Sequence, residues 1–173
     1  MEELVKKAKA GSSEAYYQLF QDVERDIYKM AFIYVNNKED ALDIVQETAY
    51  RSFKTIHTLK EPNYFKTWII RITINSSLDL LRKNKFILPI KEEQYKQYSP
   101  DRERDLPLSI TLNDLINKLD ENEKSMVILK YYQEFTFKES AELLDIPLGT
   151  AKSILYRALA KLRQDLGKED LHG

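Results

Sequence analysis

Apolar residues recur at intervals of three and four positions along most of the chain, which is the spacing of helices with one buried side. Ser12 or Ser13 is suited to cap a first long helix after Gly11. Asn36 and Asn37 interrupt the pattern, so the helix is expected to end there. Its inward side is predicted to consist of Tyr16, Leu19, Phe20, Val23, Ile27, Met30, Ala31 and Tyr34.

A second helix is predicted after Asn37, with two unlike sides. The side expected to face inward holds Ala41, Ile44, Val45, Ala49, Phe53 and Ile56. The other side carries a polar stripe at the same helical spacing, made of Asp43, Gln46, Glu47, Tyr50, Arg51 and Lys54. A solvated helix face and a protein interface are both open for this stripe.

Residues 57–63, HTLKEPN, are predicted to form a loop, and Pro62 suits the start of the next helix. The inward side of that helix is expected to hold Phe65, Trp68, Ile69, Ile72 and Leu80. Its outward side is expected to hold Lys66, Thr67, Arg71, Asn75, Asp79 and Arg82. The periodicity fails after Lys85, and residues 86–107 contain three prolines and the run SPDRERD, which predict an extended linker.

A second helical unit is predicted from about Ser109. Asp120 and Glu123 form a capping pair for a helix that would run through Gln133. Thr136–Glu139 is a capping box before a short helix, residues 138–144, and the turn DIPLG precedes a last helix, residues 151–166. No strand-like alternation is visible in the sequence. The predicted fold class is therefore all-α, with two small helical domains joined by an extended linker.

The last two predicted helices have the features of a helix-turn-helix. Pro147 would end the first helix, Gly149 would ease the turn, and Thr150 would cap the second helix. The buried side of the second helix is predicted to hold Ala151, Leu155, Ala158, Leu159 and Leu162. Its outer side holds residues suited to bases or phosphates: Lys152, Ser153, Tyr156, Arg157 and Arg163. An ordinary helical hairpin with a solvated charged face is the alternative.

The net charge of the chain is close to zero, but this does not exclude binding to DNA. The 173 residues include 27 Lys and Arg and 28 Asp and Glu. Two segments are basic: residues 51–91 hold 9 basic and 2 acidic side chains, and residues 124–168 hold 8 basic and 5 acidic ones. Two segments are acidic: residues 1–50 hold 6 basic and 10 acidic side chains, and residues 92–123 hold 4 basic and 9 acidic ones. Since salt screens exposed charges beyond about 8–10 Å, two basic segments could bind DNA separately although the net charge is −1.

The candidate chemistry is narrow. The chain has no Cys, and its only histidines, His57 and His172, lie far apart in the sequence. Asp40, Asp43 and Glu47 lack a second acidic cluster that would complete a divalent-cation site. No glycine-rich phosphate loop, nucleophile elbow or zinc-helix motif is present, and no segment resembles a signal peptide or a membrane span. We expect no cofactor, no metal, no catalytic residue and a cytoplasmic protein.

Two segments together resemble a known family. Residues 38–83 resemble the second conserved region of bacterial extracytoplasmic-function (ECF) sigma factors of the sigma-70 family. Residues 120–163 resemble its fourth region, with departures at Ala151 (usually Val) and Ile154 (often Arg), so no promoter consensus is carried over. The positions that match the second region are Asp40, Ala41, Asp43, Ile44, Gln46, Glu47 and Thr48, then Phe65, Trp68, Ile69 and Ile72, then Asn75, Asp79 and Arg82.

The resemblance implies an alternative sigma factor that binds core RNA polymerase and directs promoter-specific initiation. Residues 1–85 would bind polymerase and the minus-ten element, residues 86–107 would be the linker, and residues 108–173 would bind the minus-thirty-five element. The clamp helices of the largest polymerase subunit would contact Asp40, Asp43, Gln46, Glu47 and Arg51. The minus-ten element would contact His57, Lys60, Asn63, Lys66, Arg71, Asn75, Asp79 and Arg82. Of these, Asp79 is expected to orient an arginine and not to touch phosphate. The minus-thirty-five element would contact Thr150, Lys152, Ser153, Tyr156 and Arg157.

The resemblance also implies control by an anti-sigma factor, commonly membrane-anchored, and a role in a stress or cell-envelope response. Acidic segments would then face polymerase and basic segments would face DNA, and each basic patch alone would make few phosphate contacts. A stand-alone helix-turn-helix regulator is the alternative, but the sequence shows no heptad helix for dimerisation and no receiver domain.

Overall fold

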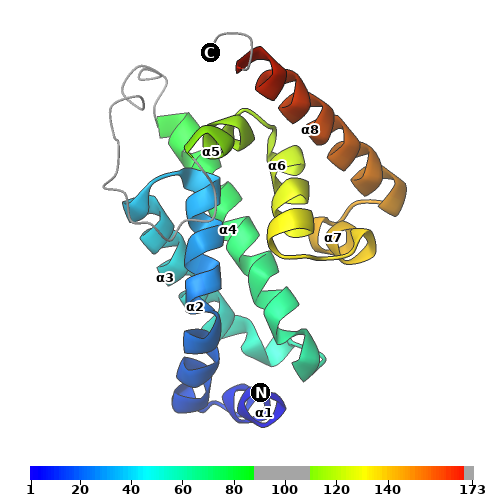
Figure 1. Cartoon of the computed structure of the whole chain (residues 1–173). Coiled ribbons are helices and arrows are strands. Elements are labelled where there is room, and N and C mark those ends of the chain that lie inside the picture. Colours follow the sequence, from blue (N-terminus) through cyan, green and yellow to red (C-terminus); the bar gives the residue numbers. More distant parts are fainter. Residues whose placement is uncertain (88–109, 170–173) are drawn as a thin grey trace.

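The computed structural model of the chain describes residues 1–87 and 110–169, and the regular elements in these ranges are all helical. Figure 1 shows two units side by side, which we call the N-terminal unit (residues 1–87) and the C-terminal unit (residues 110–169). The N-terminal unit consists of α1 (Glu2–Lys9), α2 (Ser13–Val35), α3 (Lys38–Thr55), two 3₁₀ turns (Ile56–Thr58 and Pro62–Tyr64) and α4 (Phe65–Ile87). The C-terminal unit consists of α5 (Ile110–Asn117), α6 (Glu121–Val127), a π-helical turn (Ile128–Tyr132), α7 (Phe137–Leu144) and α8 (Leu148–Glu169).

The predicted all-α class is therefore confirmed. The predicted linker falls mostly on residues 88–109, which lie outside the described residues, and the predicted domain boundaries stay a prediction.

Side-chain caps set the helix ends of the N-terminal unit. The Ser12 hydroxyl accepts a hydrogen bond from the Ala15 N–H at 3.2 Å, so Ser12 is the N-cap of α2. Asn36 adopts the left-handed conformation (φ 50°) that ends α2, and Asn37 caps α3 by accepting from the Asp40 N–H at 2.9 Å. The two asparagines thus turn the chain from one long helix into the next.

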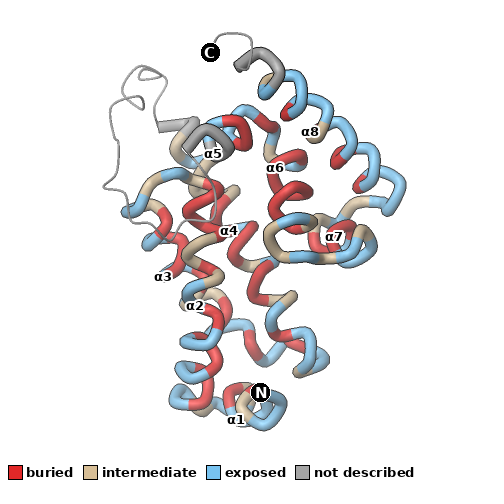
Figure 2. Tube along the Cα trace, in the orientation of Figure 1, coloured by how far each residue is buried: buried red, intermediate tan, exposed pale blue. Residues whose placement is uncertain are grey.

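The core of the N-terminal unit follows the predicted stripe of α2, all of which is buried (Figure 2). Phe53 is an exception to the prediction for α3, because 44% of it is exposed. Its ring meets the Tyr16 ring edge-on at 5.0 Å between centroids. The inward direction was right, but Phe53 sits at the rim of the core, where burial is incomplete.

Both predicted capping boxes are confirmed. In α6 the Asp120 side chain accepts from the Glu123 N–H and the Glu123 side chain accepts from the Asp120 N–H. Thr136 and Glu139 make the same reciprocal pair at α7. The helix after Asp120 does not continue to Gln133 as an α-helix, since α6 ends at Val127 and gives way to the π-helical turn.

The turn of the helix-turn-helix differs from its prediction. Asp145 adopts the left-handed conformation (φ 55°) after α7, so this residue reverses the chain and Gly149 does not. The helix α8 begins at Leu148, and the Ala151 N–H donates to the Pro147 carbonyl at 3.0 Å. Thr150 is therefore in the first turn of α8 and is not its N-cap.

The two units share one hydrophobic cluster. Met30, Ile33 and Tyr34 of α2 and Ile70 and Ile74 of α4 belong to the same buried cluster as residues of the C-terminal unit. At about 100° per residue, Ile70 and Ile74 lie on a different side of α4 from Phe65 and Ile69, which pack in the core of the N-terminal unit. Helix α4 thus has two buried sides. The partners from the C-terminal unit include Leu115, Met126, Leu129, Ala141 and Leu155.

Candidate polymerase and promoter interfaces

The polar face of α3 is present as predicted. Asp43, Gln46 and Glu47 are exposed, and Asp40 is partly buried. Burial, followed by the neighbouring Asp43 and Glu39 carboxylates, raises the pKa of Asp40 above its usual value. Because crowded carboxylates repel each other, this face is electrostatically suited to a cationic partner.

Arg51 holds the end of this face in place and ties it to α4. Its Nε donates to Glu47 Oε1 at 2.5 Å and its Nη1 donates to Asp79 Oδ2 at 2.8 Å. The hydrogen bonds to the Asp79 and Glu47 carboxylates raise the pKa of Arg51 above its ordinary value. Asp79, which the sequence groups with the minus-ten residues, therefore orients an arginine of the predicted polymerase face.

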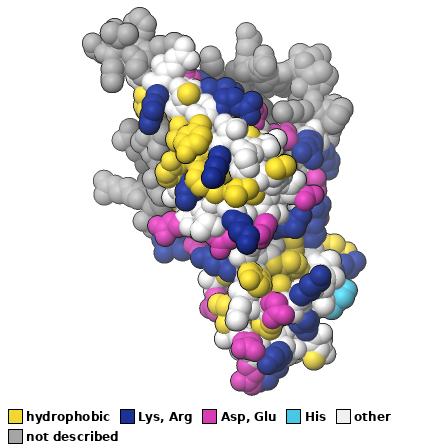
Figure 3. Space-filling view, turned by 90° about the vertical axis from the view of Figure 1, so that its right-hand side faces the viewer, with side chains coloured by type: hydrophobic (Ala, Val, Ile, Leu, Met, Phe, Trp, Pro, Cys, Tyr) yellow, Lys and Arg dark blue, Asp and Glu magenta, His cyan; other side chains and the backbone are white. Residues whose placement is uncertain are grey.

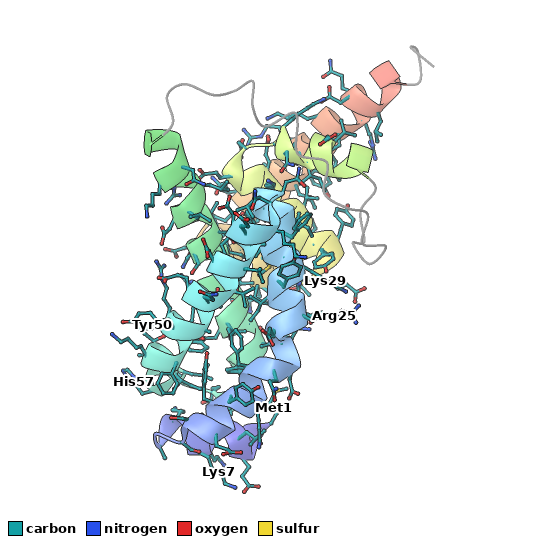
Figure 4. All side chains as sticks on the ribbon, turned by 90° about the vertical axis from the view of Figure 1, so that its left-hand side faces the viewer. Met1, Lys7, Arg25, Lys29, Tyr50 and His57 are labelled. Carbon is teal, nitrogen blue, oxygen red and sulfur yellow. The ribbon has the colours of Figure 1, made fainter. Side chains whose placement is uncertain are left out.

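Two features of the loop after α3 position its exposed side chains. His57, Lys60 and Asn63 are exposed, whereas Leu59 is buried. Lys9 of α1 donates to the Leu59 carbonyl at 2.5 Å. Figure 4 shows Tyr50 and His57 projecting outward on the same side of the molecule.

Helix α1 supports the loop after α3, and this helix was not predicted from the sequence. Helix α1 packs beside both 3₁₀ turns of the loop, and Val5 and Ala8 bury its inner side. Its signals were the acidic first turn, Glu2 and Glu3, and the lysines of its last turn.

Helix α4 does not bring all its predicted minus-ten residues together. At about 100° per residue, Arg71, Asn75, Asp79 and Arg82 fall within one exposed stripe, but Lys66 lies on the opposite side of α4. Lys66 pairs with Asp26 of α2 at 3.5 Å.

Lys66 and Asp26 also line a polar pocket together with residues of the C-terminal unit, Tyr132, Gln133 and Glu134. Burial, and then the Asp26 charge, raises the pKa of Tyr132 to about 12. Lys66 therefore faces the junction of the two units.

The outer face of α8 presents all five predicted side chains. Thr150, Lys152, Ser153, Tyr156 and Arg157 are exposed. The Ser153 hydroxyl donates to the Gly149 carbonyl at 3.0 Å, so it stays available as an acceptor. Figure 3, which views the molecule from the side of α8, shows Lys and Arg side chains spread among exposed hydrophobic ones.

The departure at Ile154 has a structural explanation. Ile154 is 5% exposed and belongs to the hydrophobic cluster that the two units share. Isoleucine at this position thus contributes to packing, and the DNA-facing side of α8 is made by its neighbours in the sequence.

Within the two described ranges, no group of three or more His, Cys, Asp or Glu residues is placed to hold a metal ion. In the same ranges, no helix is long and apolar enough to cross a membrane.

Two family models match the chain in the order of its two units. Residues 19–87 match the model of sigma-70 region 2, and residues 109–162 match the model of sigma-70 region 4. The fold and the matches together define a two-region chain of the sigma-70 type.

Curated relatives make the assignment more specific. The RNA polymerase sigma factor SigV of Bacillus subtilis is 35% identical over 150 residues, which are 87% of this chain and 90% of SigV. The ECF RNA polymerase sigma factor SigW of the same organism is 30% identical over 176 residues, 94% of each chain. The chain belongs to the ECF sigma factors of the sigma-70 family.

Solved structures agree on the fold. CnrH, in its complex with the cytosolic domain of CnrY, matches with a TM-score of 0.72 at 20% identity, over 96% of this chain and 97% of CnrH. The sigma factor RpoE of Bartonella quintana, in its complex with the anti-sigma factor NepR, matches with a TM-score of 0.71 at 20% identity, over 88% and 96%.

The family assignment fixes the general function. The chain is a transcription initiation factor that acts with RNA polymerase at promoter DNA, and it is not an enzyme. Nucleotide addition belongs to the polymerase.

Proposed function

We propose that three exposed surfaces divide the work of this sigma factor. The polar face of α3 (Asp40, Asp43, Gln46, Glu47, Arg51) binds the clamp helices of the largest polymerase subunit. The loop and the α4 stripe (His57, Lys60, Asn63, Arg71, Asn75, Arg82, with Lys66 and Asp79 beside them) bind the minus-ten element. The outer face of α8 (Thr150, Lys152, Ser153, Tyr156, Arg157) binds the minus-thirty-five duplex.

The separation of charge carries this proposal. The carboxylates Asp40, Asp43 and Glu47 gather on α3, whereas Arg71 and Arg82 lie on α4 and Lys152 and Arg157 lie on α8. An acidic face repels DNA phosphates and attracts a cationic protein surface, and a basic face does the opposite. Each surface therefore favours a different partner, although the net charge of the chain is −1.

The packed arrangement of the units supports control by a third partner. The two promoter elements lie about 25 base pairs apart, which is roughly 85 Å of duplex at about 3.4 Å per base pair. A compact chain of this length has a radius of gyration of only about 16 Å. The units must therefore separate before both elements are bound, and a protein that holds them together would block initiation.

We assign that role to an anti-sigma factor. The solved relatives CnrH and RpoE were each captured with a partner, CnrY and the anti-sigma factor NepR respectively. By analogy, this chain is proposed to be a cytoplasmic factor that a membrane-anchored anti-sigma factor holds inactive until a stress or cell-envelope signal arrives.

Run-off transcription with core RNA polymerase on a fragmented genomic library, with and without the chain, tests the proposal. Defined start sites that require the chain are expected, and their alignment would reveal both promoter elements. Polymerase binding without new starts would argue against the two DNA surfaces. No starts and no polymerase binding would favour a stand-alone helix-turn-helix regulator.

The α3 face is tested separately by Glu47→Lys, with Glu24→Lys on α2 as the matched control. Both residues are exposed, so both variants should retain full helicity, measured by circular dichroism. Only Glu47→Lys should weaken polymerase binding, by about tenfold or more. Equal affinities of the two variants would remove α3 from the polymerase interface.

A further inference from the structure

The two capping boxes of the C-terminal unit have the same hydrogen-bond pattern, but their glutamates differ in burial. Glu123 and Glu139 each occupy the third position of a helix and accept from the backbone N–H of the capping residue, at 3.2 Å and 2.8 Å. Glu139 is exposed, but Glu123 is 0% exposed. A capping box is normally a surface feature and does not require a buried carboxylate.

Glu123 is buried against α8, whose outer face is proposed to bind the minus-thirty-five duplex. Its Oε2 accepts from the Lys161 Nζ at 2.7 Å, and its Oε1 lies 3.8 Å from the Arg157 Nε. Among the described residues, Oε1 has no hydrogen-bond partner. An ionised carboxylate is costly to bury unless cations are kept close to it, so this site favours conformations in which Arg157 and Lys161 stay beside it.

The two cations remain accessible from the outside. Arg157 and Lys161 are one turn apart on α8, and their side chains are 63% and 50% exposed. A guanidinium approached at its Nε still has both terminal nitrogens free to donate. Paired N–H donors of this kind match the O6 and N7 atoms of guanine and the oxygens of phosphate.

We infer that Glu123 is a positioning residue for promoter recognition, which holds Arg157 through its Nε so that the terminal nitrogens point to the minus-thirty-five duplex. Lys161 partly neutralises the buried carboxylate. The sequence did not single out either Glu123 or Lys161 for this purpose. The inference rests on the proposed DNA-binding role of α8, and it adds that Arg157 is held in place before DNA arrives.

A double-mutant cycle on the polymerase holoenzyme tests the inference. Glu123→Gln keeps the capping box, since glutamine also serves there, but removes the charge that faces Arg157. It should weaken binding to a minus-thirty-five duplex about five- to tenfold in the native background and leave binding unchanged in an Arg157→Ala background. Low salt keeps the complex of the weaker variants measurable.

Glu139→Gln is the matched control, because it makes the same substitution at the same capping position. In the described part of the chain, the Glu139 carboxylate accepts its hydrogen bonds from Thr136 and not from α8. It should not change binding in either background. Circular dichroism of all variants should show the same helicity. Polymerase affinity, which the proposed function assigns to the N-terminal unit, should be unchanged.

Two results would overturn the inference. Equal losses from Glu123→Gln in both backgrounds would mean that Glu123 supports the fold of the unit only, and no loss in the native background would mean that Arg157 does not depend on it. Both leave the proposed function intact if Arg157→Ala itself weakens promoter binding. If Arg157→Ala has no effect, the proposed role of this arginine fails as well.

Discussion

The two units of this sigma factor are stabilised in different ways. The N-terminal unit is built from three long helices and has two hydrophobic clusters drawn from its own residues. The C-terminal unit combines the single long helix α8 with short elements. Its described buried hydrophobic residues belong to one cluster, and that cluster also includes residues of α2 and α4 of the other unit. The C-terminal unit thus completes its core on the surface of its neighbour.

Polar contacts reinforce this dependence. The Tyr34 hydroxyl donates to the Ser125 hydroxyl at 2.6 Å, and Lys124 donates to the Tyr34 carbonyl at 2.8 Å. The last turn of α2 has no basic residue of its own, so Lys124 supplies a positive charge near the negative end of the helix dipole. Separating the units should therefore destabilise the C-terminal unit more than the N-terminal unit.

The largest expected effect comes from truncating one isoleucine in each core. Ile74→Ala, in the shared cluster, and Ile27→Ala, in the cluster of the N-terminal unit, should each lower the free energy of unfolding by about 2–5 kcal/mol. Only Ile74→Ala should speed amide hydrogen exchange in α6 and α8 more than in α3. Equal exchange profiles for the two variants would show that the units do not differ in the way described.

A smaller effect is expected from Lys124→Met as pH rises. Burial lowers the pKa of Lys124 from 10.5 to about 8, so the unfolded chain binds more protons than the folded chain between these values, and stability rises with pH there. The native protein should gain about 1–2 kcal/mol relative to the variant between pH 7.5 and 9.5. Urea unfolding at each pH measures this difference.

The pH window of that experiment ends below the pH at which tyrosine side chains lose their protons. Burial raises the pKa of Tyr34 and that of Tyr132, the latter to about 12. For these groups the folded chain holds its protons longer than the unfolded chain, so stability falls with pH above about 10. A native-minus-variant difference that stays flat from pH 7.5 to 9.5 would contradict the lowered pKa of the buried Lys124.

The smallest effect should come from the exposed ion pair between the units. Arg82 lies 3.1 Å from Glu121, with side-chain exposures of 56% and 31%. Arg82→Gln should therefore change the free energy of unfolding by less than about 0.5 kcal/mol, and added salt should abolish the difference. Chemical denaturation at low and high salt checks this. A salt-independent loss of several times that size would mean that Arg82 has a structural role in joining the units.

Much of the fold followed from local patterns. The buried stripe of α2, the cap at Ser12 and both capping boxes depend on residues within a few positions of each other, and such signals are visible in a sequence. The exposed positions of α3 and α8 were predicted for the same reason. The errors at Phe53 and Thr150 lie at the edge of a core and at a helix start, where neighbours in space and a left-handed Asp145 decided the outcome.

The candidate surfaces were predicted less completely. Lys66 has the exposure expected of a DNA contact, yet it turns to Asp26 and the junction between the units. Glu123 was identified as a capping residue, but its contacts with Arg157 and Lys161 join positions 34 and 38 residues apart. No local pattern encodes such pairs, and they arise only when α6 packs on α8.

By itself, the sequence determined the helical class, most helix starts and ends, the faces that would be polar, and the family to which the chain belongs. Each of these depends on short-range spacing or on motifs in order along the chain. Only the tertiary structure decided that α4 is buried on a second side, that the arginine which Asp79 orients is Arg51, and that Lys124 meets the end of α2. The physical reason is that a helix can bury more than one side, and which sides are covered depends on elements distant in the sequence.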